Sequence, residues 1–337
     1  MNIQDGGNAM DVYKKALDLD INKIITDSDL DGVVTAAILK RWWPDAEVIF
    51  GHPGNLRAGM MDEIIDRKTA ICDLPRHPNC GLSIDHHKSN EPHGNKIRDG
   101  VVLWEPTPSA ARIAYNLLKN KIDLSDLSET MTWVDKLDGG SISIDEFKGD
   151  NSVLWLGRVI GESKGNTTKI LEKIQDRVSI KDILELPNIK LELEEIVAKQ
   201  KYLDRIIKEN LYIVDRLAIA RLENMNIRSN GYLVSAIAGD ACDACMVIHG
   251  DIGANFEEED KYPVSASFYT NSFVHKTGGI FDLTKLATNF DEDGGGHANA
   301  CGCRIKPIDN KIVTNREVIS EDIESNINGW LNIWAQR

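Results

Sequence analysis

The stretch INKIITDSDLDGVVTAAILKRWW, residues 21–43, decides how the rest of the chain is interpreted. It opens with a run rich in β-branched residues, 21–26, which is typical of a buried strand. Three carboxylates follow, those of Asp27, Asp29 and Asp31, and a mostly apolar helix begins directly after them. Two like charges about 4 Å apart repel by roughly 4 kcal/mol at an effective dielectric constant of about 20. We therefore expect a hard divalent cation, which prefers oxygen ligands, where this strand ends.

Three interpretations of this acidic stretch compete. Residues 27–32 match the first half of a calcium-binding EF-hand loop, but Ile38 stands where that loop needs a bidentate Glu. A strand also precedes the carboxylates, whereas a helix precedes an EF-hand loop. The second interpretation is a catalytic metal site at the carboxyl end of a parallel strand, where open α/β sheets bind ligands. The third is a solvated acidic turn, which is common in proteins.

Length and composition limit the class of protein. The 337 residues are enough for two domains, and 42% hydrophobic and 27% charged residues indicate a soluble globular protein. No apolar run is long enough to cross a membrane, and the N-terminus lacks the features of a signal peptide, so we expect a cytoplasmic protein without a membrane partner. The net charge of −14 argues against broad binding to long duplex DNA. It does not exclude a small anionic substrate that is held by metal ions.

The six cysteines allow two interpretations. Cys242 and Cys245 form a C-x-x-C pair, and one glycine separates Cys301 from Cys303. Four such thiolates could make a zinc site. The long spacing between the two pairs is unlike that of a zinc ribbon or finger, and free cysteines are commonly buried. The sequence therefore favours buried thiols.

Strand and helix patterns alternate along the first half of the chain. We expect strands at 21–26, 46–51, 69–73, 81–85 and 101–104, and helices at 11–19, 32–42, 57–67, 108–120, 124–138 and 151–162. This alternation is typical of a mostly parallel sheet flanked by helices. Trp133 and Trp155, in the last two helices, are expected to be buried.

A charge-rich helical region follows, and it is interrupted near Pro187. Its spacing of apolar residues suits either a helix between two lobes or a surface helix of one lobe. Strand-like runs then restart at 217–223, 232–239, 244–250 and 264–270, of which 232–239 could instead be helical. We therefore expect an α/β protein with one domain at 11–165, a helical connector at 166–210 and a second α/β domain at 211–337.

Further polar residues follow apolar runs and could reach the same edge of the sheet. They are Asp73 after the third strand, Asp85, His86 and His87 after the fourth, and Asp135 and Asp138 near the end of the helix at 124–138. An isolated Asp is commonly a cap or a turn residue, but Asp-His-His after a strand is less usual. Imidazole binds metals, and a neighbouring carboxylate can orient it. Together these side chains could hold two cations about 3.5–4 Å apart, the spacing of two-metal hydrolases.

The segment DGGGHANA, residues 293–300, is the main polar motif of the second half. Its glycines allow a close approach of the backbone to a ligand, and their amides can form an anion-binding nest. The imidazole of His297 adds a donor beside it. The segment lacks the Lys-Ser/Thr ending of a P-loop.

The order of these motifs resembles that of the DHH/DHHA1 phosphoesterases, a superfamily that includes RecJ-type exonucleases and nano-RNases. The motifs that carry the resemblance are residues 26–32, Asp73, 85–87, Asp135 and 294–297, and they extend over roughly residues 20–305. The resemblance implies an N-terminal DHH domain with a mostly parallel sheet flanked by helices, a helical linker and a smaller C-terminal α/β DHHA1 domain.

The resemblance also implies two Mn²⁺ or Mg²⁺ ions on the first domain. Asp29 would bind one ion and Asp31 the other, and Asp73 would bridge them. His86 and Asp135 would complete the ligand set.

The same resemblance implies roles for two further groups of residues. His87 would face the scissile phosphate as a catalytic residue, and Asp85 would orient the histidine pair. A terminal phosphate or nucleotide would be held in the second domain by Gly294, Gly295, Gly296 and His297.

The chain departs from the family pattern at several positions. Many relatives have a His where this chain has Ile25, and Asp27 is an additional candidate metal ligand, as in RecJ-like members. Tyr269 stands where many relatives have an Arg, which binds phosphate in a bidentate way that Tyr cannot reproduce. Asp138 is a rival to Asp135 as a ligand.

These observations predict a metal-dependent phosphodiesterase that hydrolyses short single-stranded oligonucleotides or linear dinucleotides such as pGpG or pApA. One alternative is a RecJ-like single-strand-specific 5′ exonuclease, which needs a basic, aromatic-lined channel, and no strong basic stripe occurs in the sequence. Pyrophosphatase activity and a non-enzymatic nucleotide sensor are further alternatives. The sequence leaves open whether the protein forms a homodimer.

Overall fold

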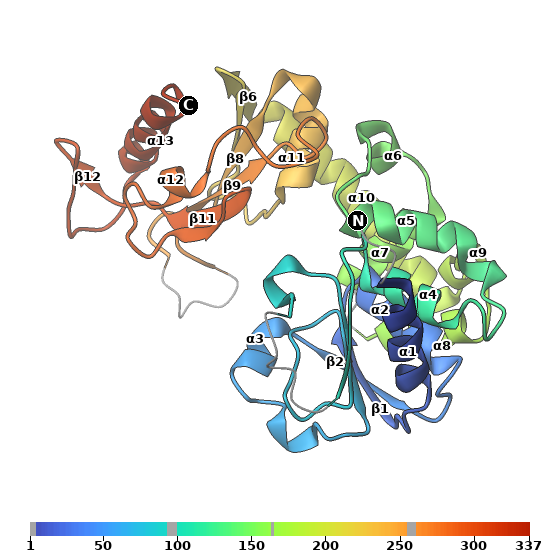
Figure 1. The fold of residues 1–337 in the computed structure, drawn as a ribbon. Coiled ribbons are helices and arrows are strands. Elements are labelled where there is room, and N and C mark those ends of the chain that lie inside the picture. The colour runs from blue at the N-terminus through green and yellow to red at the C-terminus, as the bar shows by residue number, and fades with distance from the viewer. Residues whose placement is uncertain (1–4, 93–99, 163–164, 255–260) are drawn as a thin grey trace. The chain divides into compact units, whose positions relative to one another are not determined.

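A computed structural model describes residues 5–92, 100–162, 165–254 and 261–337. The chain divides into two compact units, shown in Figure 1. The first comprises Met1–Gly140 and Asp150–Ile196, and the second comprises Ser141–Gly149 and Val197–Arg337. The short segment Ser141–Gly149 therefore leaves the first unit, joins the second and returns.

A parallel sheet of five strands forms the centre of the first unit, in the order β2-β1-β3-β4-β5. The strands are β1 (Lys23–Asp27), β2 (Glu47–Gly51), β3 (Thr69–Cys72), β4 (Leu82–Asp85) and β5 (Val101–Trp104). The three middle strands are buried on both faces, which explains their nearly continuous apolar sequences. The predicted parallel sheet and its strand positions are confirmed.

Helices cover both the sheet and one another in this unit. They are α1 (Asp5–Leu17), α2 (Leu30–Lys40), α3 (Pro53–Arg57), η1 (Asp62–Ile64), η2 (Lys88–Asn90), α4 (Ala110–Leu118), η3 (Ser125–Leu127), α5 (Ser128–Asp138), α7 (Ser152–Glu162), α8 (Thr167–Gln175) and α9 (Ile180–Leu184). Ile24 packs into the large core with α2, whereas its neighbour Ile25 faces a smaller cluster with Leu56 and Met61. Successive strand residues thus serve opposite faces.

The predicted helix at 57–67 is wrong. The structure has α3, which begins at Pro53, and then the single 3-10 turn η1. Pro is well suited to the first turn of a helix, and Gly59 follows the end of α3 with a φ of +72°. Trp133 and Trp155 are only partly buried against the core.

The expected connector at 166–210 is divided between the two units. Its first part packs into the core of the first unit through Ile170, Leu171, Ile174 and Ile183. The helix α10 (Pro187–Glu209) crosses the boundary between Ile196 and Val197.

The second unit contains a mixed sheet of six strands in the order β10-β11-β9-β8-β7-β6, of which only β7 and β8 pair in parallel. The strands are β6 (Leu211–Val214), β7 (Leu217–Arg221), β8 (Ala244–His249), β9 (Ser265–Thr270), β10 (Gly295–His297) and β11 (Ala300–Arg304). A separate hairpin pairs β12 (Ile308–Asp309) with β13 (Ile312–Val313).

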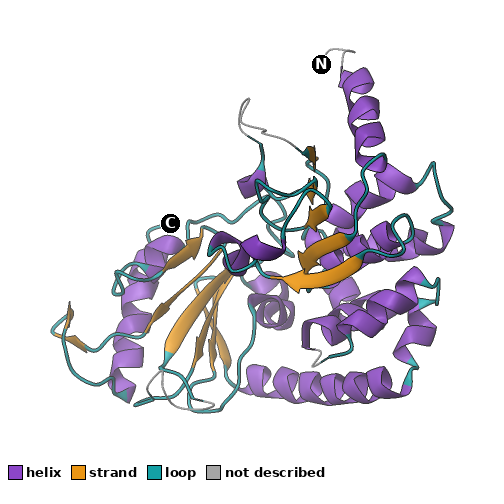
Figure 2. Ribbon diagram, turned by 90° about the horizontal axis from the view of Figure 1, so that it is seen from below, coloured by secondary structure: helices purple, strands orange, loops and turns teal. Residues whose placement is uncertain are grey.

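The helical elements of the second unit are α6 (Ile144–Lys148), α11 (Gly231–Ala238), η4 (Gly239–Ala241), α12 (Thr284–Ala287) and α13 (Ser320–Trp334). The helical alternative for 232–239 is the correct one, and Asn230 caps that helix. The helix α13 lies on one face of the sheet (Figure 2). Its Trp330 and Trp334 are buried in a cluster with Phe268. Among the residues that the structure describes, no helix combines the length and hydrophobicity that a bilayer-spanning segment requires.

Candidate metal centre

Polar side chains collect at the carboxyl edge of the parallel sheet. Asp27 is the last residue of β1, Asp73 directly follows β3, and Asp85 ends β4 and is followed by His86 and His87. This edge is where open α/β sheets bind ligands, because the parallel strands all end there and helices begin.

The imidazole of His86 lies at the centre of the cluster. Its Nε2 is 2.9 Å from the carboxylate of Asp138, 3.6 Å from that of Asp73 and 3.7 Å from that of Asp31. Two sets of potential ligand atoms share this imidazole: one adds Asp73 and His87, and the other adds Asp31 and Asp138. Carboxylate oxygens and imidazole nitrogens suit Mg²⁺ or Mn²⁺.

Asp31 is held in place by the start of a helix. Its two carboxylate oxygens accept hydrogen bonds from the backbone amides of Ala110 and Ala111, both at 2.7 Å, in the first turn of α4. The backbones of Gly32 and Asp27 pack against each other so closely that only glycine fits, since a Cβ at Gly32 would lie 2.2 Å from the carbonyl oxygen of Asp27. Burial and the nearby charge of Asp138 raise the pKa of Asp31 to about 7, although the two amides oppose the shift.

Asp73 has an unusual backbone. Its φ is +56°, in the left-handed region that few residues other than glycine adopt, and its amide donates to the carbonyl of Ile84 at 2.9 Å. Such strain is typical of functional sites. Burial and the charge of Asp31 raise the pKa of Asp73 well above its ordinary value.

Two buried atoms of the cluster test whether a metal ion fits. Within the described part of the chain, Oδ1 of Asp73 is buried without a hydrogen-bond partner, and the buried Nε2 of His86 lies 2.9 Å from Asp138 without the geometry of a hydrogen bond. A buried polar atom without a partner is costly, and a divalent cation would satisfy both atoms and oppose the repulsion between the carboxylates. The residues present therefore fit such an ion.

The histidine pair is oriented by its neighbours. Nδ1 of His86 lies 3.2 Å from the carbonyl oxygen of Thr107, an arrangement that leaves Nε2 directed at the carboxylates. Nδ1 of His87 is 2.9 Å from Asp85, which also accepts hydrogen bonds from the amide of His87 and the side chain of Asn90. The bond to Asp85, opposed by burial, raises the pKa of His87.

The structure separates the two rival aspartates of α5. Asp138 contacts His86, whereas Asp135 accepts hydrogen bonds from Nε of Arg112 at 2.9 Å and from the hydroxyl of Ser109 at 2.7 Å. Asp135 is thus already neutralised and links α5 to the start of α4. The geometry brings Asp138 to the cluster and leaves Asp135 out.

The first two aspartates of the acidic stretch have local roles. Asp29 is the N-cap of α2 and accepts a hydrogen bond from the amide of Gly32 at 2.9 Å. Asp27 accepts from the amide of Ser28 at 2.6 Å. Neither belongs to the two compact ligand sets, but both lie at the same turn as Asp31.

The glycine motif lies in the second unit, on the edge strand β10. A Cβ at Gly294 would lie 2.3 Å from the carbonyl oxygen of Ala287, and Gly296 has a φ of +136°. The backbone geometry by itself therefore requires glycine at both positions. A Cβ at Gly295 would meet nothing within 4 Å, and His297 is exposed, so this part of the motif is open to a ligand.

Tyr269, which replaces the arginine of many relatives, packs against the start of α11. A Cβ at Gly231 would lie 2.2 Å from Cγ of this ring, so the tyrosine requires glycine opposite it.

The cysteines form no metal site in the described part of the chain. Cys242 and Cys245 are buried in one apolar cluster, Cys301 is buried in another, and Cys303 is partly buried. The prediction of buried free thiols is confirmed for these first three.

Solved structures supply the comparison. The fold is similar to that of the pGpG-specific phosphodiesterase PggH from Vibrio cholerae, with a TM-score of 0.72 and 21% identity over 93% of this chain and 99% of that one. RecJ in complex with Mn²⁺ from Thermus thermophilus also matches, with a TM-score of 0.48 and 14% identity over 98% of this chain and 54% of that one. No family profile and no curated protein matches the sequence. The likeness to PggH over almost the whole of both chains shows that this protein shares the α/β fold of that phosphodiesterase, in agreement with the fold class that its sequence motifs predict.

Proposed function

We propose that the protein is a metal-dependent phosphodiesterase that hydrolyses short oligonucleotides or linear dinucleotides such as pGpG. The observation that carries the proposal is the cluster of Asp31, Asp73, His86 and Asp138. Its two buried acids, Asp31 and Asp73, have no Lys or Arg partner among the described residues. The fold adds support, because the similar PggH is described as a pGpG-specific phosphodiesterase.

The proposed ligands differ in two positions from the set implied by the sequence resemblance, because Asp29 also lies outside the compact cluster. Asp31, Asp73 and His86 stay in the set, and Asp138 replaces Asp135, because Arg112 and Ser109 already engage Asp135. Further oxygen ligands are available from Asp27 and Asp29, which lie at the same turn.

Bound Mn²⁺ or Mg²⁺ would lower the pKa of water and offset the charge of the phosphodiester. Side chains of the protein would orient the substrate phosphate. The side chain of His87 is 48% exposed, and its Nδ1 is fixed by Asp85, so Nε2 is the ring nitrogen available to a substrate phosphate. Because its pKa is raised, this imidazole is suited to donate a hydrogen bond to a phosphate oxygen.

For the second unit we propose a role in binding the substrate end. The open position at Gly295 allows a phosphate to approach the backbone, and the exposed imidazole of His297 can donate to it. Gly294 and Gly296 support this turn through their backbone conformations.

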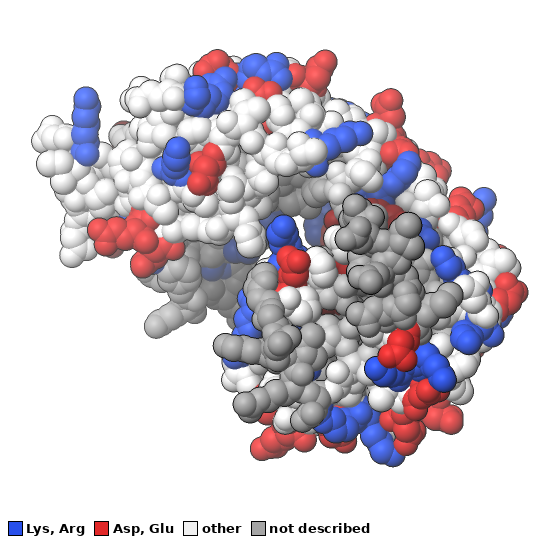
Figure 3. All heavy atoms as spheres, in the orientation of Figure 1, with Lys and Arg blue, Asp and Glu red and all other residues white. Residues whose placement is uncertain are grey.

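A substrate-length series tests the proposal. Hydrolysis of 5′-phosphorylated RNA and DNA, from dinucleotides to about 20 nucleotides, is measured with Mn²⁺ and with EDTA. We expect Mn²⁺-dependent hydrolysis that is fastest for the shortest substrates. On the face drawn in Figure 3, basic and acidic side chains are interspersed and do not form one basic stripe. A rate that rises with length, or hydrolysis that persists in EDTA, would contradict the proposal.

A further inference from the structure

The sheet of the second unit has one buried face and one face that is partly exposed. Along β9, Ala266 and Phe268 are buried, whereas the alternate residues Ser267 and Tyr269 are partly exposed. Successive strand residues point to opposite faces, and the buried pair belongs to the core that also contains residues of α13. The partly exposed pair therefore lies on the other face, where Tyr269 packs against the cluster that contains residues of α11.

A row of paired residues crosses this second face. His297 of β10 pairs with Ala300 of β11, and Ala300 pairs with Tyr269 of β9. Directly paired residues of neighbouring strands have their side chains on the same face, so the imidazole of His297 and the ring of Tyr269 lie on one side of the sheet. Two strand spacings of about 4.8 Å put their Cα atoms about 10 Å apart. Between them in the row is Ala300, which is exposed and has only a methyl group.

The next row on the same face consists of small residues. Gly295 pairs with Gly302, and Gly302 pairs with Ser267. A Cβ at Gly295 would meet nothing within 4 Å. Glycine inside a strand is typical of a place where a ligand approaches the backbone closely. We refer to the six residues of the two rows as the open face; they are Ser267, Tyr269, Gly295, His297, Ala300 and Gly302.

Tyr269 forms one border of the open face. Its ring packs against the start of α11, where a Cβ at Gly231 would lie 2.2 Å from Cγ of the ring. Since α11 contacts β7, β8 and β9, it lies on the side of Tyr269 that is away from β10. The side of the ring toward Ala300 is therefore not covered by this helix. An aromatic ring that is open on one side can stack with a nucleobase, because every base has a flat face.

The polar groups of the open face have no partner within the described chain. The hydroxyls of Ser267 and Tyr269 and the imidazole of His297 make no hydrogen bond or ion pair with another described residue. All three side chains are at least partly exposed, so these groups are available to a ligand. Arg304, further along β11, is in contrast already paired with Asp293 at 2.6 Å. Beside the histidine, the open face thus offers a ring and hydroxyl groups, which suit a nucleobase.

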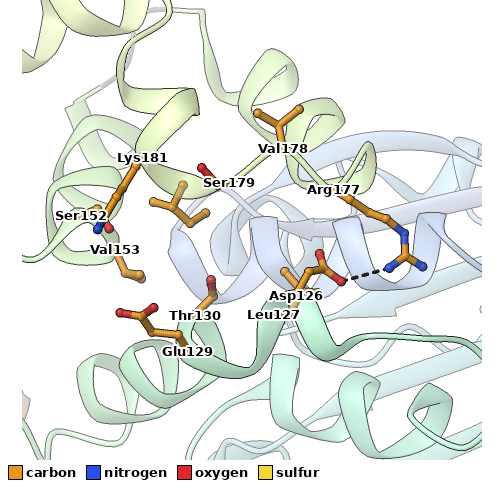
Figure 4. Close-up of a pocket in the computed structure, with 11 residues that line it drawn as sticks. Asp126, Leu127, Glu129, Thr130, Ser152, Val153, Arg177, Val178, Ser179 and Lys181 are labelled. Carbon is orange, nitrogen blue, oxygen red and sulfur yellow. Dashed lines mark hydrogen bonds and ion pairs between the residues drawn. The ribbon is translucent and has the colours of Figure 1, made fainter.

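A pocket in the first unit lacks this selectivity. It has a volume of about 270 Å³, and Arg177 in its lining forms an ion pair with Asp126 at 3.1 Å (Figure 4). Glu129 and Lys181 add one charge of each sign to the lining. Since its charged groups are of both signs and partly paired, this pocket favours no single class of ligand.

We propose that the open face binds the nucleobase at the substrate end whose phosphate the glycine motif would hold, and that the base stacks on Tyr269. The inference rests on the proposed function and adds a base-binding residue to the phosphate-binding turn. The base lies over Ala300 and Gly302, against the uncovered side of the tyrosine ring. The hydroxyl of Ser267 hydrogen-bonds to the edge of the base.

Calorimetric titration of the full chain with GMP and with ribose 5-phosphate, which lacks the base, tests the proposal. EDTA keeps divalent cations from the metal centre, so that phosphate does not bind there through a metal ion. We expect GMP to bind at least about fivefold more tightly than ribose 5-phosphate, the lower limit for stacking of one base on an aromatic side chain. Tyr269→Ala should abolish this difference, and Tyr269→Phe should retain it because the ring remains.

A second variant reaches the same site without removing a packed side chain. Ala300→Leu, at an exposed strand position, should also abolish the difference between the two ligands, because the larger side chain fills the space beside the ring. The matched control is Tyr212→Ala on β6, at the opposite edge of the same sheet, where the tyrosine is 40% exposed. It should bind both ligands normally. Thermal melts verify that each variant is folded.

His297→Ala separates the phosphate from the base. It should weaken GMP and ribose 5-phosphate to the same extent, since the histidine would contact the phosphate that both share. Equal affinity of the unaltered protein for the two ligands, equal weakening of both by Tyr269→Ala, equal effects of Tyr269→Ala and Tyr212→Ala, or no saturation with GMP below about 10 mM would each overturn the proposal.

Hydrolysis of pGpG with Mn²⁺ is measured in parallel. Its absence would contradict the proposed hydrolase but not a GMP site that depends on Tyr269. Hydrolysis together with binding that does not depend on the base would overturn the role of the open face alone.

Discussion

Both units bury aspartates, but they compensate the negative charge in different ways. In the second unit, Asp291 contacts Lys306 at 2.9 Å and Asp322 contacts Arg316 at 2.6 Å. In the first unit, Asp31 and Asp73 are equally buried, and the basic groups near them are the imidazole of His86 and, for Asp73, also that of His87. The comparison distinguishes a structural carboxylate, which the chain neutralises itself, from one that is left for a cation.

The pKa values follow this difference. For Asp291, burial opposes ionisation, but Lys306 and Arg304 outweigh it and lower the pKa. For Asp73, burial and Asp31 act in the same direction and raise the pKa. A metal ion at the first site would supply the charge that Lys306 supplies at the second.

The largest expected effect comes from Asp73. The substitution Asp73→Asn should reduce Mn²⁺-dependent hydrolysis of pGpG at least about 100-fold, since even the partners of metal ligands change activity by about 10–100-fold. The same variant should be at least as stable as the unaltered protein in EDTA, because one of two repelling carboxylates is gone. Steady-state rates and urea unfolding measure the two quantities. Full activity would remove Asp73 from the metal centre.

Asp135 and Asp138, both on α5, allow a second test of the difference between a neutralised carboxylate and a metal ligand. Asp138→Asn should weaken Mn²⁺ binding about 10–100-fold, whereas Asp135→Asn should leave it nearly unchanged. Asp135→Asn should instead lower the free energy of unfolding, because Arg112 loses its carboxylate partner. Calorimetric Mn²⁺ titration and urea unfolding of both variants provide the measurements. The opposite pattern would restore Asp135 as the ligand.

Removing a carboxylate that has a basic partner should lower the free energy of unfolding, whereas removing one that another carboxylate repels should not. Asp291→Asn should lower the free energy of unfolding in EDTA by about 1–3 kcal/mol, since the buried contacts with Lys306 and the amide of Arg304 are lost or weakened. Urea unfolding beside Asp73→Asn tests this directly. If both variants were destabilised equally, the distinction between the two kinds of aspartate would fail.

A smaller effect concerns pH. The pKa of Asp31 is about 7 in the folded chain, above its ordinary value of 3.8, so the folded state binds more protons between these values. The free energy of unfolding in EDTA should therefore fall as the pH rises from about 4 to about 7, by at most about 1.4 kcal/mol per pH unit for one group. Asp31→Asn should flatten this dependence. An unchanged slope in the variant would assign it to other groups.

Contacts between residues that are distant along the chain explain why some predictions from the sequence differ from the structure. The predicted helix at 57–67 is wrong because apolar residues there serve a short turn that covers one sheet face. The region 166–210 is expected to be a connector, yet Ile170 and Leu171 pack into the first core.

The sequence by itself determined the parallel sheet and the edge at which its polar residues gather. Strands with buried sequences end at Asp27 and Asp85 and directly before Asp73, and parallel strands have their carboxyl ends at one edge of the sheet. Only the tertiary structure decided which carboxylates stay without a counter-charge. Asp135 and Asp138 are one helical turn apart and chemically identical, but an arginine from another helix reaches only the first, and a histidine from the sheet edge meets the second.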